Sequence, residues 1–122
     1  IKEIEVMTRT TQEVFDAHQA AFEVGSLELL MADYAEDAIL LTLDGAFVGK
    51  EAVQGFFVNA LQSFPNFKVS FDKTAVEDDF FLLQWSGDSD VATFPQGVAT
   101  LHIKDGMIQR QTEWMVVVPK EA

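Results

Sequence analysis

The stretch GVATLHIKDGMIQRQTEWMVVV, residues 97–118, has the side-chain alternation and the central turn that are typical of a β-hairpin. The tripeptide at residues 104–106, Lys-Asp-Gly, predicts a tight turn that pairs Ile103 with Ile108. In that register one face carries Ala99, Leu101, Ile103, Ile108, Arg110, Thr112, Trp114 and Val116. The opposite face carries Thr100, His102, Lys104, Met107, Gln109, Gln111, Glu113 and Met115. The sequence therefore predicts a sheet with one apolar face and one polar face.

The first half of the chain has the three- and four-residue spacing of apolar side chains that predicts helices. One helix is expected over Thr10–Val24, with a threonine cap and Gly25 as its stop. A short helix capped by Ser26 is expected over residues 26–37, and a third over residues 50–64, closed by the following proline.

The remaining segments read as strands and turns. Residues 38–43 are a continuous apolar run that predicts a buried strand, and residues 44–49 are expected to turn the chain through two glycines. Residues 67–77 and 79–87 are further strands, joined by acidic turns. Helices followed by antiparallel strands predict an α+β fold in which the helices cover the apolar face of a curved sheet. A chain of 122 residues with 48% hydrophobic content suits one domain, residues 1–122.

Composition excludes several classes of function. Cysteine is absent, so disulfides, thiolate metal sites and a cysteine nucleophile are excluded. The formal charge of −12 repels phosphate backbones and anionic lipid, which argues against nucleic-acid and membrane partners. No apolar run is long enough to cross a bilayer, and the start, IKEIEVMTRT, lacks a secretory apolar region, so a cytoplasmic location is expected. The sequence has no motif of a phosphate-binding loop, a dinucleotide fold or a zinc protease, and no metal or cofactor is expected.

Three stretches resemble a known family: AAFEVGSLELLMADYAEDAIL, then GAFVGKEAVQGFF, and later IKDGMIQRQTEW. Over nearly the whole chain they are similar to the SnoaL-like and ketosteroid isomerase-like branch of the nuclear transport factor 2 superfamily. The resemblance implies a cystatin-like cone, in which three helices pack within a strongly curved, mostly antiparallel sheet around a deep pocket for a small apolar ligand. It also implies a homodimer formed through the outer face of the sheet. Because the family includes isomerases, cyclases, epoxide hydrolases, dehydratases and binding domains, fold alone does not define the chemistry.

His18 stands in the middle of the apolar stripe of the first helix, four residues after Val14 and four before Phe22. The resemblance aligns it with a tyrosine that stabilises the enolate in ketosteroid isomerases. An imidazole facing the pocket could donate a hydrogen bond or act as an acid or base. The alternative is a core histidine bonded to a backbone carbonyl.

The other catalytic residue types of the ketosteroid isomerases are missing at the positions that the resemblance aligns. The resemblance places Thr42 where those enzymes carry their general-base aspartate and Ala99 where they carry a protonated aspartate. Threonine cannot serve as a general base, which argues against steroid isomerisation. Asp44, two residues beyond Thr42, either points to the pocket mouth or accepts hydrogen bonds within an Asp-Gly turn.

Arg110 is the second polar residue predicted on the apolar face, where a guanidinium needs a partner. That partner is expected to be the carboxylate of Asp44, Asp88 or Asp90, or a ligand. The remaining pocket candidates are Tyr34, Trp85, Leu101, Thr112 and Trp114, each of which has packing as its alternative role. Asp33, Glu36 and Asp37 lack a neighbouring histidine and are expected to be an acidic helix end rather than a metal site.

Two functional hypotheses follow. The first is an enzyme with acid–base chemistry on an apolar carbonyl-type substrate, in which His18, Arg110 and Asp44 are catalytic and Tyr34 helps to polarise the substrate. The second is a binding or accessory domain whose pocket holds a ligand without converting it, or is filled by some of the eleven phenylalanines.

Overall fold

The computed structural model describes residues 8–121. Its elements are α1 (Thr11–Val24), α2 (Leu27–Met31), β1 (Tyr34–Thr42), β2 (Gly45–Val48), α3 (Lys50–Ser63), β3 (Lys68–Glu77), β4 (Phe80–Asp88), β5 (Ala92–Lys104) and β6 (Met107–Pro119). Most of the N-terminal stretch considered for a targeting signal, residues 1–7, lies outside the described residues.

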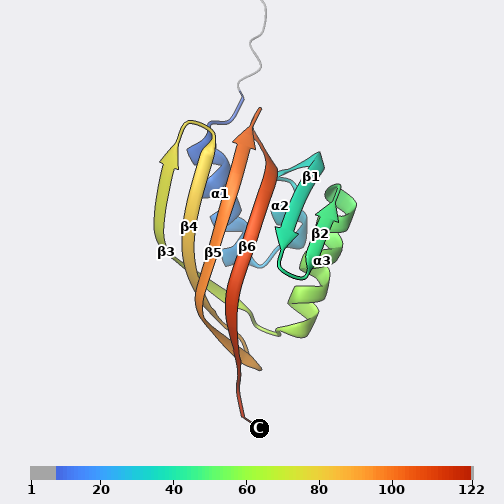
Figure 1. The fold of residues 1–122 in the computed structure, drawn as a ribbon, viewed down its shortest axis with the longest axis vertical. Helices are drawn as coiled ribbons and strands as arrows, with labels where there is room; N and C mark the ends of the chain where they lie inside the picture. Colours follow the sequence, from blue (N-terminus) through green and yellow to red (C-terminus); the bar gives the residue numbers. More distant parts are fainter. Residues whose placement is uncertain (1–7, 122) are drawn as a thin grey trace, which may run out of the picture.

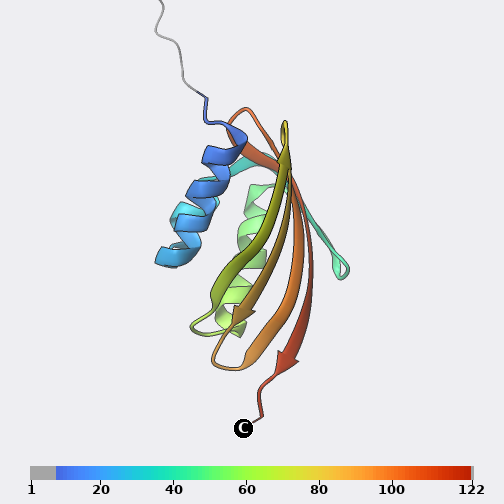
Figure 2. The same ribbon diagram turned by 90° about the vertical axis from the view of Figure 1, so that its left-hand side faces the viewer.

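The strands form one six-stranded sheet in the order β2-β1-β6-β5-β4-β3, shown in Figure 1. β1 runs parallel to β6, and every other neighbouring pair is antiparallel. Figure 2 shows that the sheet curves strongly and that α1 and α3 lie on its concave side. The α+β fold and the curved sheet predicted from the sequence are confirmed.

Local chemistry sets both ends of α1 and the start of α2 where the sequence predicts them. The side chain of Thr10 accepts a hydrogen bond from the backbone of Glu13, and the side chain of Glu13 accepts one from the backbone of Thr10. Gly25 ends α1 with a φ of 73°, a left-handed conformation that glycine adopts without strain. The side chain of Ser26 then caps α2 through the backbone N–H of Leu29.

Two predicted boundaries are wrong. The second helix ends at Met31 rather than at residue 37, and Tyr34 begins strand β1 instead of ending a helix. The segment Gly45–Val48, expected to be only a turn, forms strand β2 and pairs with residues 39–42 of β1. In both places tertiary pairing outweighs a weak local preference, because each segment is too short to show a clear period.

The core lies between the helices and the concave face of the sheet. Its fully buried members include Val14 of α1, Leu40 of β1, Phe81 of β4, Leu101 of β5 and Ile108 of β6. Burying side chains of this size contributes roughly 1.5–3 kcal/mol each. This burial orients the neighbouring side chains of the same strands toward the helices.

A β-bulge in β6 changes which residues face the core. Ile103 pairs with Ile108 as predicted, but His102 pairs with Arg110, so Gln109 is an extra residue. Beyond this point Leu101 pairs with Gln111 and Ala99 with Glu113. The predicted register is therefore wrong beyond Ile108. Gln111, Glu113 and Met115 face the concave side, whereas Arg110, Thr112, Trp114 and Val116 lie on the convex side.

None of the helices in the described part of the chain combines the length and the apolar character needed to span a membrane.

Candidate functional site

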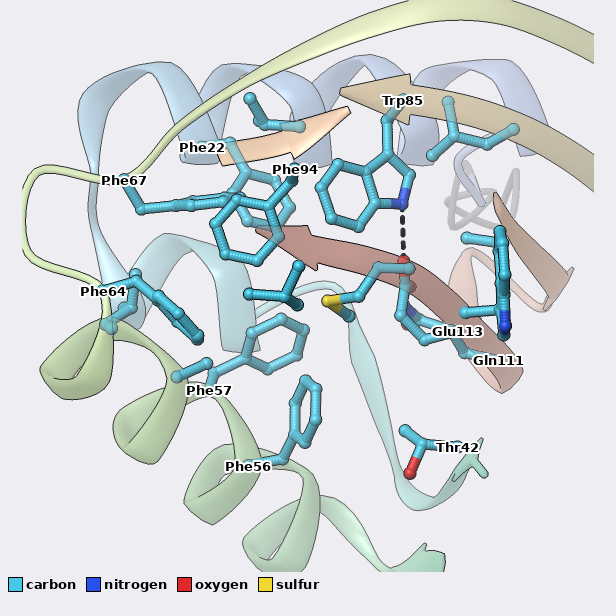
Figure 3. A pocket seen from close by; sticks show the side chains of 18 of the residues that line it. Phe22, Thr42, Phe56, Phe57, Phe64, Phe67, Trp85, Phe94, Gln111 and Glu113 are labelled. Atoms are coloured by element: carbon cyan, nitrogen blue, oxygen red, sulfur yellow. Dashed lines mark hydrogen bonds between the residues drawn. The ribbon is translucent and has the colours of Figure 1, made fainter. Parts of the chain in front are cut away.

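A cavity of about 510 Å³ lies between α1, α3 and the concave face of the sheet. Its walls are mainly aromatic, as Figure 3 shows for most of the rings. Seven phenylalanines and one buried tryptophan line it: Phe22, Phe56, Phe57, Phe64, Phe67, Phe71, Phe94 and Trp85. The rings pack against one another largely edge to face, for example Phe64 on Phe94 with ring centroids 4.8 Å apart. Although phenylalanine-rich, the interior is not filled by these side chains.

The carboxyl group of Glu113 on β6 lines this apolar cavity. The indole Nε1 of Trp85 donates to Glu113 Oε1 at 2.7 Å, the bond drawn in Figure 3. The amide Nε2 of Gln111 donates to Glu113 Oε2 at 2.9 Å. A carboxylate offers about four acceptor positions, so each oxygen keeps a lone pair for a further partner.

Tyr34 fixes the orientation of the Gln111 amide. Its hydroxyl donates to Gln111 Oε1 at 2.6 Å, which leaves the amide nitrogen to face Glu113. Tyr34 is 1% exposed, and it lies behind Gln111 rather than among the residues that line the cavity. The result is a hydrogen-bonded chain from Tyr34 through Gln111 to Glu113.

Burial raises the pKa of Glu113 and of Tyr34, the two groups that this hydrogen-bonded series connects. Burial raises the pKa of Glu113 from 4.5 to about 7, although the hydrogen bonds from Gln111 and Trp85 lower it in part. Burial, with the nearby charges of Glu113 and Asp33, raises the pKa of Tyr34 well above its ordinary value, so its hydroxyl stays a donor. Glu113 therefore populates both protonation states near neutral pH, as a proton-transferring group requires.

The close approach of Trp85 to β5 depends on Gly97, its pairing partner there. A Cβ atom at position 97 would lie 2.1 Å from Cε2 of the indole, which is far inside van der Waals contact. Glycine thus lets the indole lie flat across β5 and reach Glu113 on β6.

His18 of α1 lines the same cavity and is 3% exposed. Its Nδ1 atom lies 3.2 Å from Oδ2 of Asp33, and NH1 of Arg9 donates to Oδ1 of the same carboxylate at 2.9 Å. NH2 of Arg9 also donates to the carbonyl of Gly106, in the β5–β6 turn, at 2.8 Å. The predicted orientation of His18 toward the pocket agrees with its place in the cavity wall, and a carboxylate rather than a backbone carbonyl holds its ring.

The predicted pocket residues Thr42, Asp44, Trp85, Ala99 and Leu101 all line the cavity. Thr42 and Asp44 lie in the β1–β2 hairpin, away from the aromatic cluster, as Figure 3 shows for Thr42. Oγ1 of Thr42 accepts from the backbone N–H of Asp44 at 3.1 Å, so this segment also forms a hydrogen-bonded turn. A catalytic role for Asp44 stays a prediction.

The structure does not bring Arg110 into the cavity. The bulge at Gln109 directs Arg110 to the convex face, where NH1 donates to the backbone carbonyls of Asp37 at 3.2 Å and Gln109 at 2.7 Å. The predicted partners Asp44, Asp88 and Asp90 do not contact it. The prediction that Arg110 and His18 share one pocket is wrong, because the register behind it is wrong.

The same bulge directs Thr112 and Trp114, two predicted pocket residues, toward the convex side of β6. Thr112 is exposed, and its Oγ1 lies 2.6 Å from Oγ1 of Thr100 on the convex face. Trp114 is 43% exposed, and it is also one of the residues that line the cavity, as predicted. His102, expected on the polar face, lies there with Nε2 2.9 Å from Oδ2 of Asp79.

Glu113, Gln111 and Asp33 were not predicted as site residues. Glu113 and Gln111 were placed on the solvent face by the wrong register, and Asp33 was taken as part of an acidic helix end. One feature of the sequence could have pointed to them: all five residues at 109–113 are polar, so alternation does not define which of them face inward. Among residues 8–121, no group of three or more His, Cys, Asp or Glu side chains is placed to hold a metal ion.

A curved sheet wrapped around helices places the chain among α+β proteins with cystatin-like and NTF2-like folds. The family model of the SnoaL-like domain matches residues 15–111. The chain therefore belongs to the SnoaL-like domain family.

Solved structures agree with this fold. A provisionally assigned polyketide cyclase from Sinorhizobium meliloti has 17% identity and a TM-score of 0.74, with 83% of this chain and 93% of that chain covered. A provisionally assigned ketosteroid isomerase from Kribbella flavida has 16% identity and a TM-score of 0.74, with coverages of 96% and 87%. An NTF2-like protein of unknown function from Cytophaga hutchinsonii has 15% identity and a TM-score of 0.73, with coverages of 93% and 95%. A search of curated proteins gave no significant match.

Proposed function

We propose that this protein is an enzyme that transfers a proton on an apolar carbonyl compound, with Glu113 as the acid–base group. The observation that carries the proposal is a carboxyl group with a pKa of about 7 in the wall of an aromatic cavity. Cyclase and isomerase assignments among structures of the same fold agree with this class of chemistry. The proposed step uses side chains of this chain alone.

In that step the Glu113 carboxylate removes a proton from the carbon beside the carbonyl group. The C–H electron pair moves into the enolate, and Glu113 becomes a neutral carboxylic acid. In an isomerisation the acid returns the proton to another carbon of the enolate. In a cyclisation the enolate carbon attacks a second carbonyl group, and the acid protonates the resulting alkoxide.

The hydrogen bonds to Glu113 support this role. Trp85 and Gln111 each occupy one lone pair of a different oxygen, so the carboxyl is held in place while both oxygens stay available. The aromatic walls favour flat, apolar ligands, and the burial of the carboxyl strengthens its electrostatic interactions.

Hydrogen–deuterium exchange of 2-tetralone, a bicyclic ketone with acidic α-protons, tests the proposal. We expect the wild type to catalyse the exchange in D2O, with a rate that rises as Glu113 ionises near pH 7. Glu113→Gln is expected to slow exchange at least about 100-fold, because it removes the general base. Glu77→Gln, at the exposed end of β3, is the matched control and should leave the rate unchanged.

Two results would contradict the proposal. The first is equal exchange by wild type and Glu113→Gln. The second is tight binding of 2-tetralone without any exchange, which would favour the alternative of a non-catalytic binding domain.

We also propose that two copies of the chain associate through the convex face of the sheet. This face exposes large apolar side chains of three strands, including Phe80 at 54%, Leu82 at 47% and Trp114 at 43%. Leu82, Thr100 and Thr112 lie side by side across β4, β5 and β6. Exposed apolar groups gathered on one face of a sheet favour a two-fold interface.

A further inference from the structure

The two histidines of the chain face carboxylates through different ring nitrogens. His18 places Nδ1 3.2 Å from Asp33, whereas His102 places Nε2 2.9 Å from Asp79. A neutral imidazole carries a single proton, and a nitrogen that faces an ionised carboxylate keeps it. The two rings are therefore expected to be opposite tautomers, one inside the cavity wall and one on the convex face.

At His18 the neighbouring Arg9 further determines which ring nitrogen carries the proton. A guanidinium is always charged and only donates hydrogen bonds, so the Asp33 oxygen 2.9 Å from NH1 acts as an acceptor. The two groups form a salt bridge, and the Asp33 side chain is only 3% exposed. The second oxygen of Asp33 must then accept from Nδ1 of His18.

The other ring nitrogen of His18, Nε2, makes no hydrogen bond to the residues that the structure describes. No buried side-chain nitrogen or oxygen of these residues lacks a partner, so Nε2 is accessible from the cavity that its ring lines. The ring edges of Phe22 and Tyr34 enclose the imidazole, with centroid separations of 5.1 and 5.5 Å. Glu113 and Asp44 are the other two titratable side chains among the described residues that line the cavity.

We propose that Asp33, held by Arg9, is a positioning residue that fixes His18 as the Nδ1–H tautomer, so that Nε2 presents a proton acceptor to the cavity. The ligand is then a carbonyl compound that also bears a hydroxyl or phenol group, whose O–H donates to Nε2. The ligand assignment rests on the proposed function, because it places substrate in this cavity. The tautomer is a property of the free protein.

Two-bond 1H–15N NMR spectra of the wild-type protein test the tautomer directly, because protonated and unprotonated ring nitrogens have widely separated 15N shifts. At a pH where both rings are neutral, we expect His18 to carry its proton on Nδ1 and His102 on Nε2. A proton on Nε2 of His18 would overturn the proposal. This measurement needs no variant, so folding of a mutant does not limit it.

Asp33→Asn tests the positioning role. Arg9 only donates, so the new amide must keep its oxygen toward Arg9 and turn its NH2 group toward Nδ1 of His18. Nδ1 then has to accept, and the proton moves to Nε2. We expect the 15N pattern of His18 to invert in this variant and that of His102 to stay the same. Asp79→Asn is the matched control, which should change the 15N pattern of His102 and leave that of His18 as it is in the wild type. An unchanged His18 pattern in folded Asp33→Asn would overturn the role of Asp33.

Binding of 2-naphthol and 2-methoxynaphthalene, which differ in one O–H donor, tests the ligand class. We expect the wild type to bind 2-naphthol about fivefold more tightly, as one added hydrogen bond predicts, and Asp33→Asn to lose this preference. Equal affinities in the wild type, or a preference that survives in Asp33→Asn, would overturn the ligand assignment. The exchange of 2-tetralone depends on Glu113 and reports separately on the proposed function.

Discussion

The indole of Trp85 on β4 crosses β5 and donates a hydrogen bond of 2.7 Å to Glu113 on β6, two strands away. Such a contact needs a strand between them with no side chain at the crossing point. Gly97 provides it, and the carboxyl group that we propose as the acid–base centre is thereby held by a residue on a non-neighbouring strand.

Gly97→Ala is expected to displace the indole, because the new methyl group would lie 2.1 Å from Cε2 of Trp85. Overpacking of this kind costs roughly 1–3 kcal/mol of folding stability. Denaturant unfolding measures the loss, and tryptophan fluorescence reports the altered environment of Trp85. Gly55→Ala in α3 is the matched control: nothing lies within 4 Å of its Cβ position, so helix propensity should make it neutral or stabilising. Equal stability of Gly97→Ala and Gly55→Ala would contradict the close approach.

Glu113 is expected to make stability fall as pH rises from about 4.5 to about 7. In this range the folded protein holds a proton that the unfolded chain has released, so each step upward in pH favours unfolding. Glu113→Gln removes the titrating group, and its stability relative to wild type should therefore improve between pH 5 and pH 8, by roughly 1–3 kcal/mol. Thermal or urea unfolding of both proteins at the two pH values measures the difference. A constant difference between the two proteins would show that the carboxyl titrates normally.

Neighbouring substitutions on β6 test the bulge. Arg110→Ala is expected to change folding stability by no more than about 0.5 kcal/mol, because the side chain is exposed. Gln111→Ala should cost about 2–3 kcal/mol, because it leaves the buried hydroxyl of Tyr34 without a partner and removes one of the two hydrogen bonds to Glu113. Urea unfolding at one pH gives both values. The reverse order of the two losses would support the continuous register predicted from the sequence.

Leu82→Glu tests the proposed homodimer. A charge on the convex face should be costly to bury between two sheets, so the variant is expected to be monomeric while wild type is a dimer. Light scattering after size-exclusion chromatography measures both masses. Val24→Glu, at an exposed site 71% accessible on α1, introduces the same charge away from the sheet and should leave the dimer intact. A monomeric wild type would contradict the proposal.

Much of the fold could be predicted because each element has a strong local signal. The capping residues Thr10 and Ser26 and the stop at Gly25 act through neighbouring backbone groups, and the sequence shows them directly. The inward set on β6 could not be predicted in this way. All five residues at 109–113 are polar, so alternation of polarity gives no register, and a bulge adds one residue without a distinct signature.

The partner of His18 illustrates a different difficulty. The helical stripe correctly placed the ring toward the interior, but Asp33 lies 15 residues further along the chain, in a segment that was expected to be helical. Its buried position results from the early end of α2 and the start of β1 at Tyr34. Long-range pairs of this kind depend on the tertiary arrangement, which a single sequence does not specify.

The extra residue at Gln109 has an evolutionary consequence. In most positions a codon change replaces one side chain. The gain or loss of one codon at the bulge would instead turn the inward-facing Gln111 and Glu113 outward and turn Arg110, Thr112 and Trp114 inward. Length variation at the bulge can thus replace an acidic interior with a basic one in a single mutational event. Comparisons between homologues that treat such a gap as neutral would overlook a change of chemistry.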